Sequence, residues 1–309
     1  MPSSPTLVSY FKITRPINLA LLAITQLLVK FVFLETLGQP LAMETSIFLL
    51  FVLACVCIAA GGNVINDVYD VTIDTINKPE KVIVGRFISE KKAVFFYMAL
   101  TIIGVGLGFV VANHVGRPGL AAIFIVVAAL LYFYASFGKS IVLLNNIWIA
   151  ALVAFGVLIV LIFDVYPVII RTERAPYVAA SQLIFHYAVF AFILNWIREI
   201  VKDVEDINGD QNGGISTLPI ALGRSRSLSL IFIMGVVTSL LVLYYTYVNF
   251  YQNAFLSGYF LIAVVAPLIY FCIRAWHAET PKDYGLLSLL LKGIMFTGVL
   301  SLFLLKQLL

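Results

Sequence analysis

Charged residues are scarce in this chain of 309 residues: Asp, Glu, Lys and Arg together make up 12% of it, against about 25% in soluble domains. Hydrophobic residues make up 62%. A soluble domain of this composition would leave too much apolar surface in water, so we expect an integral membrane protein surrounded by membrane lipid. The net charge of +4 says little by itself, and we expect no nucleic-acid partner.

Cysteine and histidine are also scarce, with three of each. Cys55, Cys57 and Cys272 all lie in apolar segments, and Cys55-x-Cys57 lacks zinc-ligand spacing and a neighbouring histidine. We interpret the cysteines as small buried hydrophobic residues, which excludes a disulfide framework. The histidines are scattered without ligand spacing: His114, His186 and His277.

Apolar segments long enough to cross a bilayer recur along the chain, since a transmembrane helix needs about 20 apolar residues. The segment before Arg15 contains no signal-peptide core or cleavage site, so the first apolar segment is expected to remain as a helix. The pattern predicts an all-α integral membrane protein, with one domain over residues 1–309. Its nine candidate spans are roughly 17–36, 45–65, 92–112, 119–137, 144–163, 177–198, 227–248, 254–274 and 285–305.

The distribution of basic residues predicts the orientation of these spans. The N-terminus and the connections after the second, fourth, sixth and eighth spans hold 14 of the 20 Lys and Arg residues, and the opposite side holds four. Cytoplasmic loops are enriched in Lys and Arg. We therefore expect the N-terminus and the candidate site to face the cytoplasm and the C-terminus to lie outside.

Two rows of oxygen-bearing side chains have matched spacing. The first row follows the second span and the second row follows the sixth, and positions 63-67-70-74 and 199-203-206-210 share intervals of four, three and four. Residues at these intervals lie on one face of a helix. Like charges so placed repel by roughly 0.2–0.5 kcal/mol per pair, and a hard divalent cation is the natural neutralising partner. The first acidic row is Asn63, Asn66, Asp67, Asp70 and Asp74, and the second is Glu199, Asp203, Asp206 and Asp210.

Basic residues follow the rows and are candidates to bind phosphate groups. Positive-inside topology alone would also place basic residues there. Lys78, Lys81 and Arg86 follow the first row, and Lys139 lies between the fourth and fifth spans. The segment 208–214 reads as a helix end and flexible loop, which would place Asp210 on a frayed turn.

Three motifs resemble those of the UbiA-type intramembrane prenyltransferases. Asn66-x3-Asp70-x3-Asp74 is similar to the first aspartate-rich motif of that family. Residues 202–210 resemble its second motif, in the form Lys-Asp-x-x-Asp-x-x-Gly-Asp, and Arg15-Pro16-x-Asn18 resembles its N-terminal signature. Within the family, residues 73–79 and the second motif look most like the archaeal-type geranylgeranylglyceryl phosphate geranylgeranyltransferases.

The resemblance implies nine helices around a central cavity that binds a polyprenyl diphosphate through two Mg²⁺ ions. It implies metal ligands in both rows: Asn66, Asp67, Asp70, Asp74, Glu199, Asp203, Asp206 and Asp210. The catalytic set would be Asp70, Asp74, Asp203 and Asp206. The substrate contacts would be Arg15, Asn18, Asn66, Lys78, Lys81, Arg86 and Lys139. Lys78 and Lys81 stand where the family usually has arginines. A lysine lacks the planar guanidinium group with which arginine binds two phosphate oxygens at once.

The reaction implied is a carbocation-like prenyl transfer. The diphosphate leaves from an allylic carbon, and an apolar cavity excludes the water that would trap the cation. The acceptor is expected to be a lipid hydroxyl, such as that of geranylgeranylglyceryl phosphate. Alternatives are an aromatic quinone precursor of the homogentisate, 4-hydroxybenzoate or dihydroxynaphthoate type, or a tetrapyrrole. A remote alternative, an ion-coupled transporter, is disfavoured because no acidic row occurs on the opposite side.

Overall fold

The computed structural model describes residues 7–138, 141–169 and 174–305, and the regular structure in these residues is helical. Nine segments among them are long and apolar enough to cross a membrane, which confirms the predicted all-α class and the nine spans. The sixth span is much longer than predicted. The spans are Pro16–Leu37, Thr45–Tyr69, Glu90–His114, Pro118–Ser136, Leu144–Ile169, Ala175–Asn212, Arg224–Phe250, Ala254–Trp276 and Pro281–Leu305.

Four spans are single helices, and five are built from several helical elements. The single helices are α3 (Thr45–Tyr69), α5 (Glu90–His114), α9 (Ala175–Asn212) and α11 (Arg224–Phe250). The composite spans are α2 (Pro16–Leu27) with η1 (Leu28–Phe33) and η2 (Leu34–Leu37); η4 (Pro118–Leu120) with α6 (Ala121–Ser136); α7 (Leu144–Val160) with η6 (Leu161–Val165) and α8 (Tyr166–Ile169); α12 (Ala254–Phe260) with η7 (Leu261–Val265) and α13 (Ala266–Trp276); and α14 (Pro281–Leu300) with α15 (Leu302–Leu305).

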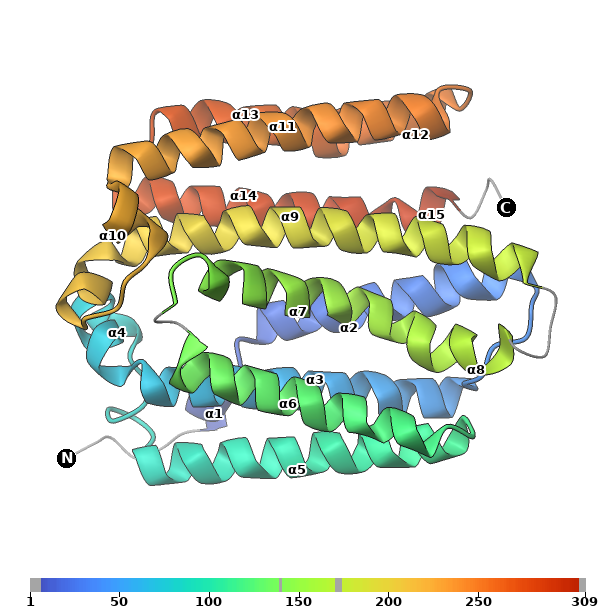
Figure 1. Cartoon of the computed structure of the whole chain (residues 1–309), viewed down its shortest axis with the longest axis horizontal. Helices are drawn as coiled ribbons and strands as arrows, with labels where there is room; N and C mark the ends of the chain where they lie inside the picture. Colours follow the sequence, from blue (N-terminus) through green and yellow to red (C-terminus); the bar gives the residue numbers. More distant parts are fainter. Residues whose placement is uncertain (1–6, 139–140, 170–173, 306–309) are drawn as a thin grey trace.

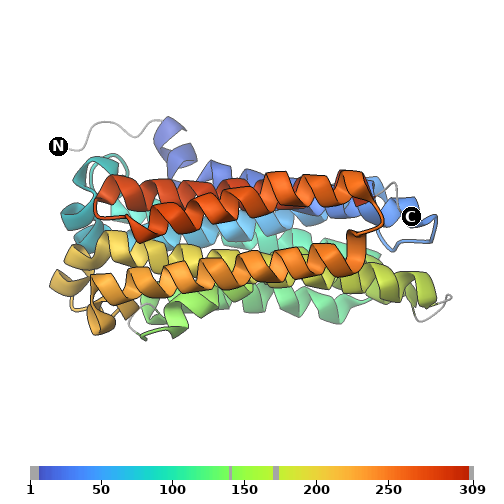
Figure 2. The ribbon, with the colours of Figure 1, turned by 90° about the horizontal axis from the view of Figure 1, so that it is seen from above.

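The long helices run side by side along one axis of the molecule (Figure 1). Short helices gather at one end of this bundle, where α4 (Val71–Asn77) and α10 (Leu218–Leu222) lie, whereas α8, α12 and α15 lie at the opposite end. Figure 2 shows α1 (Leu7–Ile13) at the edge of the bundle. We call the end with α4 and α10 the polar end, because both acidic rows reach it.

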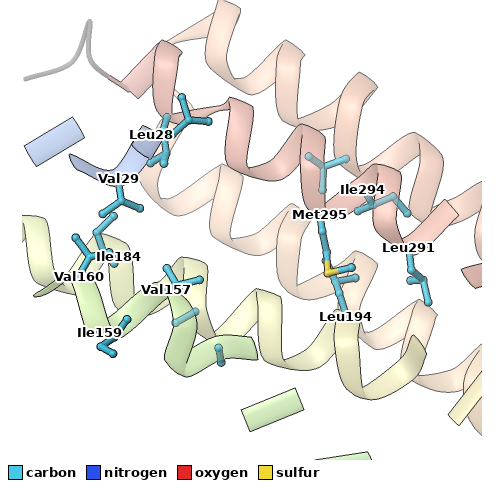
Figure 3. Packing of buried hydrophobic residues seen from close by; sticks show 14 of the residues in the cluster. Leu28, Val29, Val157, Ile159, Val160, Ile184, Leu194, Leu291, Ile294 and Met295 are labelled. Atoms are coloured by element: carbon cyan, nitrogen blue, oxygen red, sulfur yellow. The ribbon is translucent and has the colours of Figure 1, made fainter. Parts of the chain in front are cut away.

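The interior of the bundle is a continuous apolar cluster to which α2, η1, α7, α9 and α14 contribute. In Figure 3, Leu194 of α9 faces Met295 of α14, and Val29 of η1 lies beside Ile184 of α9. The outward faces are apolar as well: Ile102, for example, exposes 71% of its surface. Apolar residues both inside and outside the bundle are what a membrane-spanning fold requires, since lipid rather than water surrounds it.

Small residues let the helices approach closely. A Cβ atom added to Gly108 of α5 would lie 2.3 Å from the ring of Phe124 in α6, and one added to Gly104 would lie 2.6 Å from Ile58 in α3. Neither glycine can be replaced without moving a neighbouring helix. Close backbone approach at glycine is a common way for helices to pack in a membrane.

A buried ion pair joins two of the π-helical segments away from the polar end. Lys30 of η1 and Asp164 of η6 lie 2.9 Å apart (Nζ to Oδ2), and their side chains are 2% and 0% exposed. The ammonium also donates to the carbonyl of Met43 (2.6 Å), whose own N–H donates to Asp164 Oδ1 (2.8 Å). The pair therefore fastens the first and fifth spans to the loop that precedes α3.

The first acidic row does not lie on one continuous helix, contrary to the prediction. Helix α3 ends at Tyr69 and α4 begins at Val71, with Asp70 between them at φ −89° and ψ −3°. The chain keeps helical hydrogen bonds through this bend, since the N–H of Asp70 donates to Asn66 O (3.0 Å) and that of Asp74 to Asp70 O (2.8 Å). The row is thus bent at Asp70.

The second row is more regular than predicted. Helix α9 continues to Asn212, so Asp210 lies inside the helix and not on a frayed turn. The prediction was wrong because α4 packs against α9 here: the side chain of Asn77 accepts the N–H of Gly209 (2.8 Å). The chain leaves the helix at Gly214, which has φ +71°.

Candidate functional site

Both acidic rows line the polar end of one cavity of about 840 Å³, a size typical of small-molecule sites. The rest of its wall includes apolar side chains from several spans, among them Leu22, Val29, Phe124, Val157 and Leu302. The cavity therefore combines a charged mouth with an apolar interior.

Nearly all of the predicted site residues line this cavity: Arg15, Asn18, Asn66, Asp67, Asp70, Asp74, Lys78, Lys81, Glu199, Asp203, Asp206 and Asp210. Arg86 is not among the lining residues; its guanidinium lies 5.2 Å from the centre of the Phe87 ring. Lys139 lies outside the described residues.

Arg15 connects the N-terminal segment to the first row. It lies between α1 and α2 in the left-handed region (φ 55°), and its Nη2 donates to Asp67 Oδ1 at 2.6 Å. Burial lowers the pKa of Arg15, but the charge and hydrogen bond of Asp67, with the charges of Asp70 and Asp74, outweigh burial and raise that pKa above its ordinary value. Arg15 thus remains a fixed cation at the cavity mouth.

Amide side chains order the rest of the first row. Asn66 Nδ2 donates to Asp70 Oδ2 at 2.8 Å, one turn further along. Asn63 donates to the backbone carbonyl of Thr14 at 2.9 Å, which holds α3 against the segment that precedes Arg15. These contacts direct carboxylates and Arg15 toward the same space.

The second row is held by contacts from both the same helix and a neighbouring one. Glu199 Oε1 accepts from Arg198 Nη1 and from Lys202 Nζ, both at 2.9 Å. Asp203 Oδ2 accepts from Asn146 Nδ2 at 2.8 Å, and Asn145 Nδ2 lies 3.4 Å from the same oxygen. Sequence reasoning missed these two asparagines, although two adjacent amides at the start of an apolar span were a signal that could have found them.

Lys78 joins the two rows directly. Its Nζ lies 2.7 Å from Asp206 Oδ1 and 3.3 Å from Glu205 Oε2. Burial lowers the pKa of Lys78, but the charges and hydrogen bonds of Asp206 and Glu205 outweigh burial and raise the pKa above its ordinary value. Lys78, which follows the first row in sequence, is therefore paired with Asp206 of the second row and with the neighbouring Glu205.

A model of the UbiA prenyltransferase family matches residues 22–297. The chain belongs to the UbiA prenyltransferase family. This UbiA-family chain is accordingly an intramembrane prenyltransferase, the class of enzyme that the three sequence motifs predicted. The matched residues include both acidic rows, whereas Arg15 and Asn18 at the cavity mouth precede them.

Its relatives include archaeal proteins of similar length. The digeranylgeranylglyceryl phosphate synthase of Methanosphaera stadtmanae is 30% identical over 266 residues, covering 84% of this chain and 85% of that protein. The protein of the same name from Thermococcus gammatolerans is 29% identical over 293 residues, covering 95% and 96%.

Solved structures share the fold of this UbiA-family chain. A structure described for digeranylgeranylglyceryl phosphate synthase in membranes has a TM-score of 0.64 at 24% identity and covers 98% of this chain and 99% of that one. A UbiA homolog from Archaeoglobus fulgidus, bound to GPP and Mg²⁺, has a TM-score of 0.57 at 17% identity and covers 95% and 99%. At these identities the likeness establishes the fold.

The donor chemistry of this UbiA-family site fits a hard divalent cation. Among residues 7–138, 141–169 and 174–305, no three His, Cys, Asp or Glu side chains lie close enough together to hold a metal. Arg15, Lys78 and Lys202 are paired with Asp67, Asp206 and Glu199. Both rows nevertheless offer only carboxylate and amide oxygens, the ligands that Mg²⁺ prefers. The buried Oδ1 of Asn146, beside Asp203, has no hydrogen-bond partner within the described part of the chain.

Proposed function

We propose that this enzyme transfers a geranylgeranyl group from geranylgeranyl diphosphate to the hydroxyl of geranylgeranylglyceryl phosphate, with Mg²⁺ as cofactor. The names of its relatives support this acceptor, since digeranylgeranylglyceryl phosphate is the product of that transfer. The Archaeoglobus fulgidus homolog bound to GPP and Mg²⁺, or to DMAPP and Mg²⁺, supports the donor class and the metal.

The observation that carries the proposal is the meeting of two acidic rows, more than 100 residues apart in sequence, at the mouth of one apolar cavity. A prenyl diphosphate has the same division, with a charged head and an apolar tail. Because the rows come from both halves of the chain, we propose that residues 1–309 act as a single domain.

We assign the metal ligands to the two rows, one Mg²⁺ ion to each. Asn66, Asp67, Asp70 and Asp74 would hold the first, and Glu199, Asp203, Asp206 and Asp210 the second. Bound there, Mg²⁺ supplies positive charge that stabilises the leaving diphosphate. Asp70, Asp74, Asp203 and Asp206 are the catalytic set in this proposal.

Protein cations complete the diphosphate site. Arg15, Lys78 and Lys81 line the charged mouth of the cavity and would bind phosphate oxygens, as would Asn18. Arg15 and Lys78 are held by acids of different rows. A diphosphate that takes over these cations leaves the carboxylates to the metal.

The apolar wall of the cavity protects the carbocation-like prenyl group from water during the transfer. The C1–O bond of the donor breaks with its electron pair passing to diphosphate, and positive charge develops on the allylic carbons. The acceptor hydroxyl oxygen then bonds to C1 and passes its proton to the released diphosphate or to a carboxylate of the second row. Side chains such as Val29, Phe124 and Leu302 exclude water from the prenyl chain, so that hydrolysis does not compete.

The test is transfer by the purified full-length chain in lipid nanodiscs. Labelled geranylgeranyl diphosphate is supplied with geranylgeranylglyceryl phosphate, with homogentisate, 4-hydroxybenzoate or dihydroxynaphthoate, or with a tetrapyrrole. We expect product from the phosphorylated lipid in the presence of Mg²⁺ and none in excess EDTA. Transfer to an aromatic acceptor or a tetrapyrrole alone would contradict the proposed acceptor. Full turnover in EDTA would contradict the proposed need for Mg²⁺.

We further propose that the polar end faces the cytoplasm, which places the N-terminus inside and the C-terminus outside. The excess of Lys and Arg near α4 and α10 supports this orientation. Single cysteines at Ser225, beside the polar end, and at Gln252, in the loop between α11 and α12, test it in a chain without its native cysteines. We expect a membrane-impermeant maleimide to label only Gln252→Cys in intact cells; labelling of Ser225→Cys alone would reverse the orientation.

A further inference from the structure

One wall of the cavity carries polar residues that neither acidic row explains. Lys292 and Ser288 of α14 line the cavity, and so do Arg198 and Asn195 of α9. Positions 288 and 292 are four apart and share one face of α14. Lys292 lies in a membrane-spanning helix, where a cation costs roughly 2.5–3.5 kcal/mol on insertion scales. A charge in that position requires a partner.

The protein supplies too few partners for the cations on this wall. Lys292 forms no ion pair or hydrogen bond with any residue in the described ranges. Arg198 is 8% exposed, and its buried Nε has no hydrogen-bond partner among the described residues. Glu199 already pairs with both Arg198 and Lys202, at 2.9 Å each.

Two other cations at the cavity mouth, unlike Lys292, each form an ion pair with an acid. Lys78 is paired with two acids, and Arg15 is paired with Asp67. On the wall formed by α9 and α14, by contrast, three cations (Arg198, Lys202 and Lys292) line the cavity with two carboxylates, Glu199 and Asp203, which leaves one positive charge in excess. An excess of cations in a cavity partly shielded from water favours an anion from outside the chain.

We propose that Arg198 and Lys292, with Ser288, bind the phosphate monoester of the acceptor lipid, as a second anion subsite apart from the diphosphate. This inference rests on the proposed function and specifies how the acceptor is recognised. A phosphate monoester carries about −1.5 to −2 charge at neutral pH, and it would offset the excess of cations on the wall.

The donor types on the wall suit phosphate. The guanidinium of Arg198 keeps its charge and presents several N–H groups to tetrahedral oxygens, and Lys292 adds a point charge. The hydroxyl of Ser288 adds a neutral hydrogen-bond donor, whereas the amide of Asn195 already donates to Ala191 O and Met295 Sδ. The wall also reaches deeper apolar residues, since Met295 and Val299 of α14 line the same cavity. The acceptor's own prenyl chain would lie along them.

The test compares two acceptors in two proteins. Wild type and Lys292→Gln receive geranylgeranylglyceryl phosphate or its dephosphorylated analogue, geranylgeranylglycerol, at saturating donor and Mg²⁺. We expect Lys292→Gln to raise the KM for the phosphorylated acceptor by about tenfold or more, the effect of losing a charge-assisted hydrogen bond. The KM for the donor should stay within about twofold. For the dephosphorylated analogue the two proteins should be alike.

Direct binding provides a readout other than turnover. Geranylgeranylglyceryl phosphate should raise the Tm of the wild type in EDTA without donor, and Lys292→Gln should lose most of that shift. Lys282→Gln is the matched control, because Lys282 lies on α14 outside the cavity wall. Arg198→Lys, which keeps a cation beside Glu199, should give a smaller rise in acceptor KM than Arg198→Gln.

Distinct outcomes separate this inference from the proposed function. If the wild type transfers no prenyl group to the phosphorylated lipid, the proposed function fails. If it does, but Lys292→Gln leaves the acceptor KM and the Tm shift unchanged, the subsite is wrong. A rise in the donor KM alone would assign this wall to the diphosphate and also overturn the inference.

Discussion

The side chain of Asn77 accepts the N–H of Gly209 at 2.8 Å and donates to the carbonyl of Asp206 at 3.0 Å, so a single amide clamps α4 onto α9. Helix α9 carries the second acidic row, and α4 carries Asp74, the last residue of the first row. A Cβ atom on Gly209 would lie 2.3 Å from Asn77 Nδ2. A side chain at position 209 would therefore displace the Asn77 amide that holds α4 against α9.

Replacing Gly209 should separate the rows. We expect Gly209→Ala to lower kcat/KM by on the order of 10-fold to 100-fold, because displacing a positioning contact by about an ångström can cost that much. Steady-state kinetics of the purified protein measure it. Gly285→Ala is the matched control, since a Cβ there would meet nothing within 4 Å. Equal activity of both variants would contradict the clamp.

Asn77 and Gly209 should also behave as one unit. Asn77→Ala removes the same clamp from the other side, so the double variant Asn77→Ala/Gly209→Ala should lose little more activity than either single variant. Residues in direct contact commonly show such non-additivity. Effects that simply multiply would indicate that the two residues act independently.

The acids of the two rows should be indispensable to turnover. We expect Asp70→Ala and Asp206→Ala each to lower kcat by at least about 100-fold, because each removes a charge from the site that stabilises the leaving diphosphate. Size-exclusion profiles and Tm check that the variants fold. Glu90→Ala, an acid of α5 away from the cavity, should retain full activity. Wild-type rates in either row variant would refute the assignment.

Lys78 should support the fold uniformly across neutral pH. A group whose folded pKa is raised contributes stability fully below its unfolded pKa and loses it only as pH rises through the folded value. For Lys78 both values lie at or above about 10.4, since its neighbours Asp206 and Glu205 raise the pKa. The Tm difference between wild type and Lys78→Gln should thus be constant from about pH 6 to about pH 9. A difference that vanishes within that range would contradict the pairing.

The buried pair Lys30–Asp164 should matter to stability. Lys30→Met leaves Asp164 buried without its cation, and breaking a buried pair in this way costs about 3–5 kcal/mol. Lys30→Met/Asp164→Asn should recover most of the loss, because asparagine is neutral and still accepts the N–H of Met43. Thermal unfolding in one detergent compares the three proteins. An unaltered Tm in Lys30→Met would show that the pair contributes nothing.

Much of the fold follows from local rules. A span must supply about 20 apolar residues to cross the bilayer, so nine spans can be counted directly along the chain. Spacing on a helix is equally local, which is why both acidic rows could be recognised. The bend at Asp70 and the extension of α9 to Asn212 were missed, because contacts between α4 and α9 decide where these helices end.

The sequence by itself determined that this is a nine-span membrane protein with two acidic rows and a prenyltransferase signature. Tertiary structure alone decided that Lys78 pairs with Asp206 and that Asn146 holds Asp203. It also decided that Lys292, one lysine inside an apolar span, lines the same cavity as Arg198. The physical reason is that hydrophobicity and helical spacing act over neighbouring residues, whereas these pairings depend on how distant helices pack.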